Sequence, residues 1–281
     1  MNGLDKRAGR RYAPLMTDIQ AARDFFPRGL IQPAGSFRFS LDALLLAAFA
    51  AQMAEQAPKP ASGQSPLLLD LGCGCGVAAF GLMLLRPEFA AIGLDKQAPL
   101  LEAATANAAR LGFGGRYQAL AADLETPGGL AEMERLFAAR PADLVIANPP
   151  YRLPGSGRLP ASESRRQALF GGAGNLAAFV RAAALAAGDT GTVCLIFPCA
   201  REDELVARLA EEDLRVRRRL LVRNRAGEEP FFSLLGTRAK ASPAGSPTHS
   251  ELVLYREGAA TGLTEESLFF CPFLACNQKR N

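Results

Sequence analysis

Residues 67–76 read LLLDLGCGCG, and this stretch decides the fold. Apolar residues that end in an acid and alternating glycines indicate a buried strand followed by a tight turn. Glycine suits the turn because it adopts positive φ and lets a ligand approach the backbone closely. We therefore expect a strand, a glycine loop and a helix around a pocket for a nucleoside-type cofactor.

Outward from this loop the chain alternates between strand and helix patterns. Strands are expected at residues 67–71, 91–95, 117–121, 142–147, 190–197 and 215–223. Helices are expected at residues 41–55, 77–85, 97–111, 128–138, 176–187 and 202–212. Such alternation needs right-handed crossovers, so it predicts an α/β fold with a mostly parallel central sheet and helices on both faces. Residues 231–235 and 252–255 also have strand patterns.

The composition is that of one globular unit. The 281 residues are 49% hydrophobic and 21% charged, which supports a sizeable core. We expect a single domain over residues 29–281 and, before it, a basic arm at residues 1–28 that carries Lys6, Arg7, Arg10 and Arg11. The arm is either a mobile, solvated terminus or an electrostatic contact to phosphates. The formal net charge of +4 permits a nucleic acid partner but does not require one.

Cysteine spacing and the start of the chain bear on location. The six cysteines have no regular disulfide spacing, and no apolar stretch follows the charged first residues, so we expect reduced thiols and no secretory signal. The longest apolar run, residues 43–51, is too short to span a bilayer. These features predict a cytoplasmic protein without membrane contact.

Acidic residues follow the next two predicted strands. Asp95 ends residues 91–95, where a carboxylate can accept hydrogen bonds from both ribose hydroxyls. Asp123 follows residues 117–121, where it can accept from an adenine amino group. Taken singly, each aspartate is more typical of a helix cap or a solvated turn. Together with the glycine loop, at one edge of a parallel sheet, they define a nucleoside site.

The glycine loop and both aspartates resemble the class I S-adenosylmethionine-dependent methyltransferases. Residues 70–76, DLGCGCG, match their first motif, and Asp95 and Asp123 match the later acidic positions. The resemblance implies a Rossmann-like sheet with an antiparallel hairpin at its edge, which the two late strands would supply. It also implies S-adenosylmethionine as the cofactor. The cofactor-binding residues would be Asp70, Gly72, Gly74, Gly76, Asp95, Asp123 and Asn148.

A second motif, Asn148-Pro149-Pro150-Tyr151, follows the apolar run 142–147. It resembles the motif of methyltransferases that act on planar amino or amide nitrogens, which implies a catalytic role for all four residues. The Asn148 side-chain oxygen and the Pro149 backbone oxygen can accept the two N–H groups of such an amine, which aligns its nitrogen without a strong base. The prolines stiffen the loop, and Tyr151 can stack on a base. The structural alternative is a strand stopped by two prolines, with Tyr151 in the core.

Other reactive residues predict less chemistry. Cys73 and Cys75 lack further ligands nearby, so we interpret them as small loop residues and expect no metal. His249, the only histidine, lies in the Pro/Ser-rich stretch 239–250, interpreted as a loop, which argues against a histidine-based nucleophilic mechanism. The arginines within residues 215–225 leave two interpretations open, a charged edge strand or a phosphate-binding patch.

Two further stretches bear on the substrate. Residues 32–47 and 221–228 resemble the adenine-N6 methyltransferases of valine tRNA, which modify the base beside the anticodon. This resemblance implies an RNA partner, a tRNA. The alternatives are glutamine-N5 methyltransferases of release factors, whose extra helical domain has little room between Phe37 and the glycine loop, and guanine-N2 methyltransferases of ribosomal RNA. A scaffold that binds the cofactor or RNA without turnover is the alternative that is not an enzyme.

Overall fold

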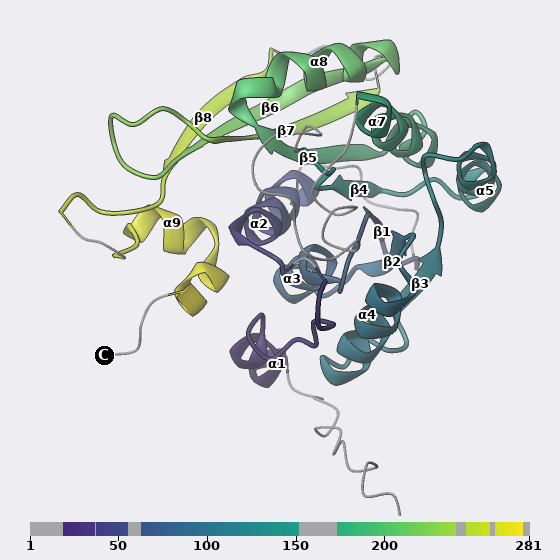
Figure 1. The fold of residues 1–281 in the computed structure, drawn as a ribbon, viewed down its shortest axis with the longest axis horizontal. Coiled ribbons are helices and arrows are strands. Elements are labelled where there is room, and N and C mark those ends of the chain that lie inside the picture. The colour runs from purple at the N-terminus through teal and green to yellow at the C-terminus, as the bar shows by residue number, and fades with distance from the viewer. Residues whose placement is uncertain are drawn as a thin grey trace, which may run out of the picture.

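An eight-stranded sheet runs through the computed structural model of the chain (Figure 1). The structure describes residues 19–36, 38–55, 63–151, 173–239, 246–258 and 262–277. The strands lie in the order β3 (Tyr117–Ala121), β2 (Ala90–Asp95), β1 (Leu67–Leu71), β4 (Leu144–Ala147), β5 (Thr192–Pro198), β7 (Phe232–Ala239), β6 (Leu214–Arg223) and β8 (Thr248–Val253). Strands β1 to β5 are parallel, and the direction of strand order reverses between β1 and β4. Parallel sheets bind ligands at such a switch point.

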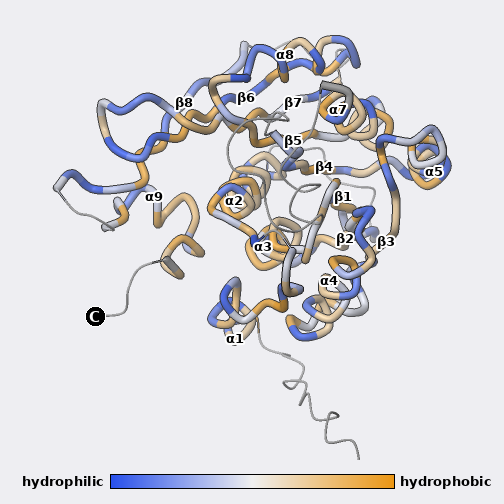
Figure 2. The backbone as a smooth tube through the Cα atoms, in the orientation of Figure 1, coloured by the Kyte–Doolittle hydropathy of each residue, from blue (hydrophilic) through white to orange (hydrophobic). Residues whose placement is uncertain are grey.

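Helices cover both faces of the sheet. One face packs against α2 (Leu41–Glu55), α3 (Val77–Leu85) and α4 (Ala98–Arg110), and the other against α5 (Pro127–Phe137), α7 (Ala173–Ala187) and α8 (Glu202–Glu211). Strand β1 serves both cores, because Leu68 faces the first core and Leu69 faces the second. Figure 2 shows apolar residues along the central strands and on α2 and α3. The expected α/β fold is therefore confirmed.

The antiparallel hairpin lies elsewhere than expected. It consists of β6 and β7, and β7 inserts between β5 and β6, antiparallel to both. Strand β8 pairs with β6 in parallel, so the expected pairing of residues 231–235 with 252–255 is wrong. Burial explains the arrangement. Strand β7 is buried over residues 233–237 and suits the interior of the sheet, whereas β8 is exposed over residues 248–251 and suits its edge.

The stretch that we expected as a basic arm contains a helix, α1 (Ile19–Phe25). Ala22 and Phe26 are buried, and the Phe26 ring meets Phe273 edge-on with centroids 4.7 Å apart. Arg23 donates a 2.8 Å hydrogen bond to the Leu84 carbonyl at the end of α3. Residues 19–28 therefore pack on the domain, which corrects the expected arm for this part. Lys6, Arg7, Arg10 and Arg11 lie outside the described residues.

The C-terminal elements close the first core. Helix α9 (Glu265–Phe270) and the 3₁₀-helix η2 (Pro272–Asn277) follow β8, and η2 packs against α2. The Cys271 thiol donates to the Leu44 carbonyl at 3.4 Å. Among the helices of the described ranges, none combines the length and the apolar character that a membrane span requires.

Several of the arginines within residues 215–225 are held by partners within the chain. Strand β6 lies between β7 and β8, so the interpretation of residues 215–223 as an edge strand is wrong. Arg218 donates to Gln52 and stacks over Phe49. Ion pairs join Arg219 to Glu202 at 2.7 Å, Arg223 to Glu251 at 2.9 Å and Arg225 to Glu228 at 3.6 Å. These contacts leave less positive charge for a phosphate than the sequence indicates.

Candidate active site

The two sequence motifs meet at the switch point of the sheet. In the register of the parallel pair β1 and β4, Leu71 is the partner of Ala147. The next residues, Gly72 and Asn148, therefore leave neighbouring strands at the same edge. A cleft opens there, lined by the predicted residues Asp70, Gly72, Gly74, Asp95, Asp123, Asn148, Pro149, Pro150 and Tyr151. Gly76 does not line it.

The glycine loop is built on positive φ angles. Gly72, Gly74 and Gly76 have φ of 69°, 55° and 88°. A Cβ on Gly74 would meet nothing within 4 Å, so the loop backbone is bare where it faces the cleft. A Cβ on Gly76 would lie 2.2 Å from the Phe80 ring. Gly76 therefore serves the packing of α3, and Gly74 keeps space open for a ligand.

Asp95 fixes this loop to the end of β2. Its carboxylate accepts a hydrogen bond from the Gly74 amide at 2.9 Å and another from the Gln97 amide at 2.9 Å. Burial raises the pKa of Asp95, and the hydrogen bonds from Gln97 and Gly74 oppose that shift. Each carboxylate oxygen has a second lone pair for a ligand hydroxyl.

Asp70 lies at the base of the cleft and is 3% exposed. Its carboxyl accepts from the Ala79 amide at 3.2 Å, which ties β1 to the first turn of α3. Burial raises the pKa of Asp70 to about 8, against the lowering effect of that hydrogen bond. Asp70 is therefore protonated over much of the neutral range, and a positive charge bound nearby favours its ionised form.

Asp123, the third predicted acidic residue of the lining, follows β3. Asp123 accepts a hydrogen bond from the Glu125 amide at 3.1 Å, so it caps its own turn while lining the cleft. Glu125 pairs with Lys96 at 3.0 Å and accepts from the Asn175 amide nitrogen at 2.5 Å. Asn175 belongs to α7, which packs on the second core, and it also lines the cleft.

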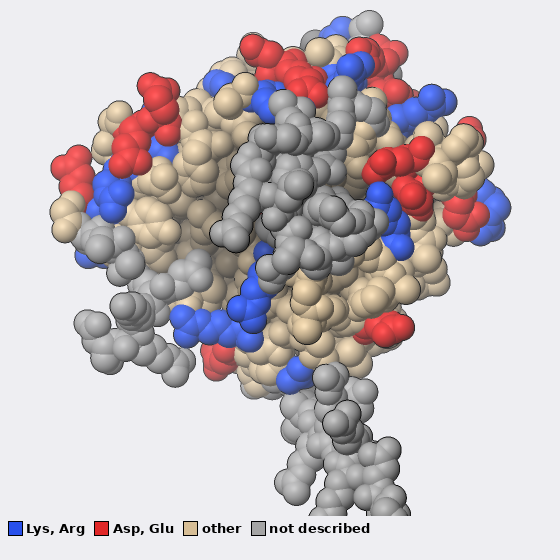
Figure 3. Space-filling view, in the orientation of Figure 1, with Lys and Arg blue, Asp and Glu red and all other residues tan. Residues whose placement is uncertain are grey.

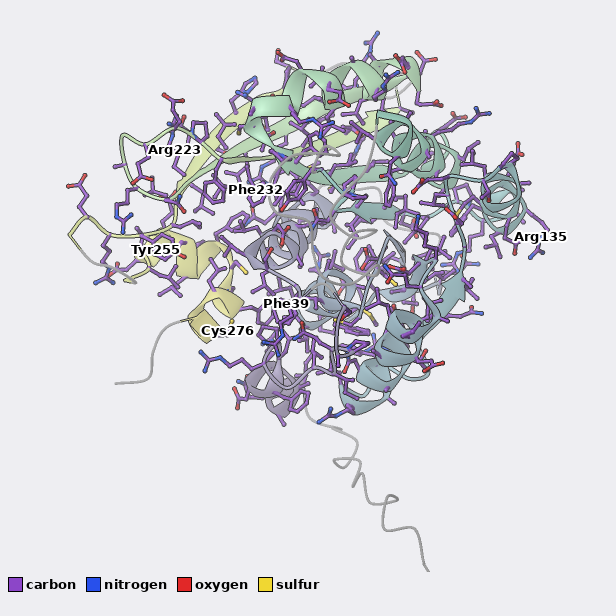
Figure 4. All side chains as sticks on the ribbon, in the orientation of Figure 1. Phe39, Arg135, Arg223, Phe232, Tyr255 and Cys276 are labelled. Atoms are coloured by element: carbon purple, nitrogen blue, oxygen red, sulfur yellow. The ribbon has the colours of Figure 1, made fainter. Side chains whose placement is uncertain are left out.

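The tetrapeptide 148–151 follows β4, and all four of its residues line the cleft. Pro149 is buried, and Asn148, Pro150 and Tyr151 are half-buried. The Tyr151 ring stands edge-on to Phe197 and Phe232, with centroids 6.5 and 5.9 Å apart. Tyr151 thus packs against the second core, as the structural alternative requires, and also lines the cleft. In Figure 4, Phe39 and Phe232 lie toward the centre of the view.

Three buried oxygens of the lining have no hydrogen-bond partner among the described residues. They are Oδ2 of Asp42, Oδ1 of Asn148 and Oδ1 of Asn175. The Asn175 side chain donates its amide N–H to the Glu125 carboxylate, which has no proton to donate when ionised. The amide oxygen of Asn175 therefore faces away from Glu125. An unpaired buried acceptor is costly, so the lining suits a ligand that is rich in N–H donors.

Sequence reasoning did not identify several residues in and around the cleft, among them Asp42, Asn175, Phe39 and Arg201. Asp42 lies in the first turn of α2, where an acid is common, so its position alone does not mark it as a cleft residue, and nothing local marks Asn175. Phe39 lines the cleft beside Asp42. Arg201, in the 3₁₀-helix η1 (Cys199–Arg201), donates to the Tyr151 carbonyl at 2.5 Å, a contact that no local pattern predicts.

Cysteines contribute no reactive thiolate to the cleft. Burial raises the pKa of Cys73 and raises that of Cys75 to about 12, so both remain neutral thiols. All six cysteines are free. Within the described ranges, no three His, Cys, Asp or Glu side chains cluster as metal ligands. Figure 3 shows Lys and Arg interspersed with Asp and Glu over the face in view.

Comparison with known proteins gives matches for both sequence and fold. A family model described as a methyltransferase domain matches residues 67–216, just over half of the chain. The human MTRF1L release factor glutamine methyltransferase is 28% identical over 100 residues, and the match covers 36% of this chain but only 28% of that protein.

Two solved structures share the fold at low sequence identity. The predicted O-methyltransferase Atu636 from Agrobacterium tumefaciens is 18% identical, with a TM-score of 0.60 over 83% of this chain and 97% of that one. The catalytic domain of hMettl16, in complex with the MAT2A 3′UTR hairpin 1, is 13% identical, with a TM-score of 0.55 over 83% of this chain and 84% of that one. At these identities the likeness extends to the fold alone.

Proposed function

The chain belongs to the methyltransferase domain family, and from this premise we propose that it methylates adenine N6 in a tRNA, as on valine tRNA beside the anticodon. S-adenosylmethionine is the methyl donor. The single observation that carries the proposal is the side-chain oxygen Oδ1 of Asn148, which is buried and has no hydrogen-bond partner among the described residues. Asn148 follows β4 at the edge of the sheet where the glycine loop follows β1. An acceptor in that place suits a planar amine that must be held for methyl transfer.

The residues of the cleft fit the cofactor. Asp95 would hold the ribose hydroxyls, Asp123 the adenine amino group, and the backbone of residues 72–76, which is bare at Gly74, the methionine part. When bound, the cofactor supplies an electrophilic methyl group on a positively charged sulfur. Asp95 gives the cleft negative charge that suits this cation, and the bound cation in turn favours the ionised form of Asp70.

Asn148 and Pro149 would orient the target nitrogen. An exocyclic amine is a poor nucleophile because its lone pair is delocalised into the ring. Hydrogen bonds from its two N–H groups to the Asn148 side chain and the Pro149 carbonyl help the lone pair to localise and fix its direction. No strong general base is required for this step, because the nitrogen becomes acidic as it is methylated and releases its proton to water. His249 lies exposed on β8 and is not part of the cleft lining.

The aromatic side of the cleft favours a flat ring as the substrate. Tyr151 is backed by Phe197 and Phe232, and Phe39 lies on the lining as well. Such a surface can stack on a base that is turned out of the RNA. Unstacking the base costs less free energy in a single-stranded anticodon loop than in a duplex. An extended glutamine side chain offers no ring to stack against.

Methylation of a release-factor glutamine is the second candidate. The match to the human release factor glutamine methyltransferase favours it, although this chain spans only 28% of that protein's length. A glutamine amide also presents two N–H groups to Asn148 and Pro149, so the tetrapeptide alone suits both substrates. Guanine N2 of ribosomal RNA is a third acceptor of the same kind.

One assay separates these acceptors. The full chain is incubated with methyl-labelled S-adenosylmethionine in three parallel reactions, which contain bulk tRNA, release factor or ribosomal RNA as the acceptor. We expect label in tRNA, recovered as N6-methyladenine after nuclease digestion. Label in the release factor or in ribosomal RNA instead would overturn the tRNA assignment. Cofactor binding without any transfer would favour a scaffold.

A further inference from the structure

Arg201 is held on three sides by described residues. Its guanidinium donates to the Tyr151 carbonyl at 2.5 Å and to the Glu204 carboxylate at 2.9 and 2.7 Å. Its centre lies 5.2 Å from the centroid of the Phe197 ring. The side chain is only 18% exposed. The guanidinium is a planar fork that stays charged at every working pH.

The bond to Tyr151 is placed where the sheet stops holding the chain. The ladders that pair β4 with β1 and β5 both end at Ala147, so residues 148–151 leave the sheet. Arg201 reaches the far end of this segment from the end of β5, and Phe197, under the guanidinium, also contacts the Tyr151 ring. The two ends of the tetrapeptide are thus fixed by different elements.

We propose that Arg201 is a positioning residue for methyl transfer, which acts through the Tyr151 carbonyl to keep the tetrapeptide aimed at the target amine. The proposal rests on the proposed function. Arg201 does not line the cleft, so it touches neither ligand directly. Loss of the Arg201 side chain leaves the residues that would bind the cofactor unchanged but allows the tetrapeptide 148–151 to move. Small misplacements at a reacting centre have large kinetic costs.

The helix that follows Arg201 offers a matched control. Arg208 forms an ion pair with Glu211 at 2.8 Å, with the same i,i+3 spacing as the pair of Arg201 with Glu204. Neither Arg208 nor Glu211 lines the cleft. The variants Arg201→Met and Arg208→Met therefore remove the same type of ion pair, and only the first also removes the bond to Tyr151 and the guanidinium over the Phe197 ring.

The kinetic test compares these variants on the substrate that the wild type methylates. We expect Arg201→Met to lower kcat roughly tenfold to a hundredfold, as for loss of a hydrogen bond to a charged group, with cofactor Kd unchanged. Arg201→Lys should recover little, because an ammonium cannot bridge both acceptors over the ring. Guanidinium ions added to the assay should partly restore the kcat of Arg201→Ala. An unchanged kcat in Arg201→Met would overturn the proposal.

A second readout does not depend on turnover. Hydrogen exchange of the cofactor-free protein, followed by mass spectrometry, should show faster exchange in peptides covering residues 144–151 for Arg201→Met but not for Arg208→Met. If the wild type methylates no acceptor, the proposed function fails while this measurement still decides whether Arg201 holds the tetrapeptide. Equal exchange in the two variants would refute the positioning role. Glu204→Gln, which keeps Arg201, replaces Arg201→Met if that variant does not fold.

Discussion

Replacing Gly74 with alanine should separate folding from cofactor binding. Gly74 has φ of 55°, and an added Cβ meets nothing within 4 Å. The folded state therefore bears only the cost of left-handed backbone for a residue with a side chain, about 1–2 kcal/mol. For a chain of this size that corresponds to a fall in Tm of about 2–8 °C. The variant should still fold.

The effect on the cofactor should be larger. The new methyl group stands on the part of the loop that faces the cleft, where the bare backbone allows close approach. If it displaces one hydrogen bond to a charged group, the loss is about 1.5–3 kcal/mol. Such a loss weakens the affinity for S-adenosylmethionine about tenfold to 150-fold.

Titration calorimetry and thermal melts measure the two effects, and Gly227→Ala is the matched control. Gly227 has φ of 79° and also has nothing within 4 Å of an added Cβ, but it lies between β6 and β7, outside the cleft lining. It should lose a similar amount of stability and keep cofactor affinity. Full affinity in Gly74→Ala would refute the placement of the cofactor on this loop.

Three further predictions concern the acids and the aromatic wall. Burial raises the pKa of Asp70 from 3.8 to about 8, so between these pH values the folded protein keeps a proton that the unfolded chain releases. The free energy of unfolding should therefore fall as pH rises through this window, by at most about 1.4 kcal/mol per pH unit. Thermal melts of Asp70→Asn should show a flatter dependence on pH. Asp95→Asn turns an amide donor toward the Gly74 or Gln97 amide, so calorimetry should show about tenfold or greater loss of cofactor affinity. Tyr151→Phe should keep most methyl transfer and Tyr151→Ala should raise KM for the acceptor about tenfold or more, since stacking needs the ring and not the hydroxyl.

The central part of the sheet was predictable because its signals are local. The run at residues 67–71 and the glycines after it define a strand and a turn without help from distant residues. Parallel strands place their carboxyl ends at one edge, so Asp95 and Asn148 had to come near Gly72 once the alternation was recognised.

What the sequence did not indicate depends on long-range packing. Strand β7 takes its central place because both of its faces are buried, which its pattern alone does not distinguish from an edge pair. Helix α1 is short, and Phe26, which follows it, is buried against Phe273 near the C-terminus, a contact that no local pattern reveals. Asp42 and Asn175 reach the cleft from helices that are distant in sequence from the motifs, so only the fold reveals them.

The most direct test of the central claim is a single-turnover measurement of methyl transfer by Asn148→Ala, run beside calorimetry of its cofactor binding. If the Asn148 oxygen holds the target amine in line with the methyl group, transfer should fall by about a hundredfold or more while the cofactor Kd changes little. Transfer at the wild-type rate, or a loss fully accounted for by weaker cofactor binding, would contradict the assignment of this residue to catalysis.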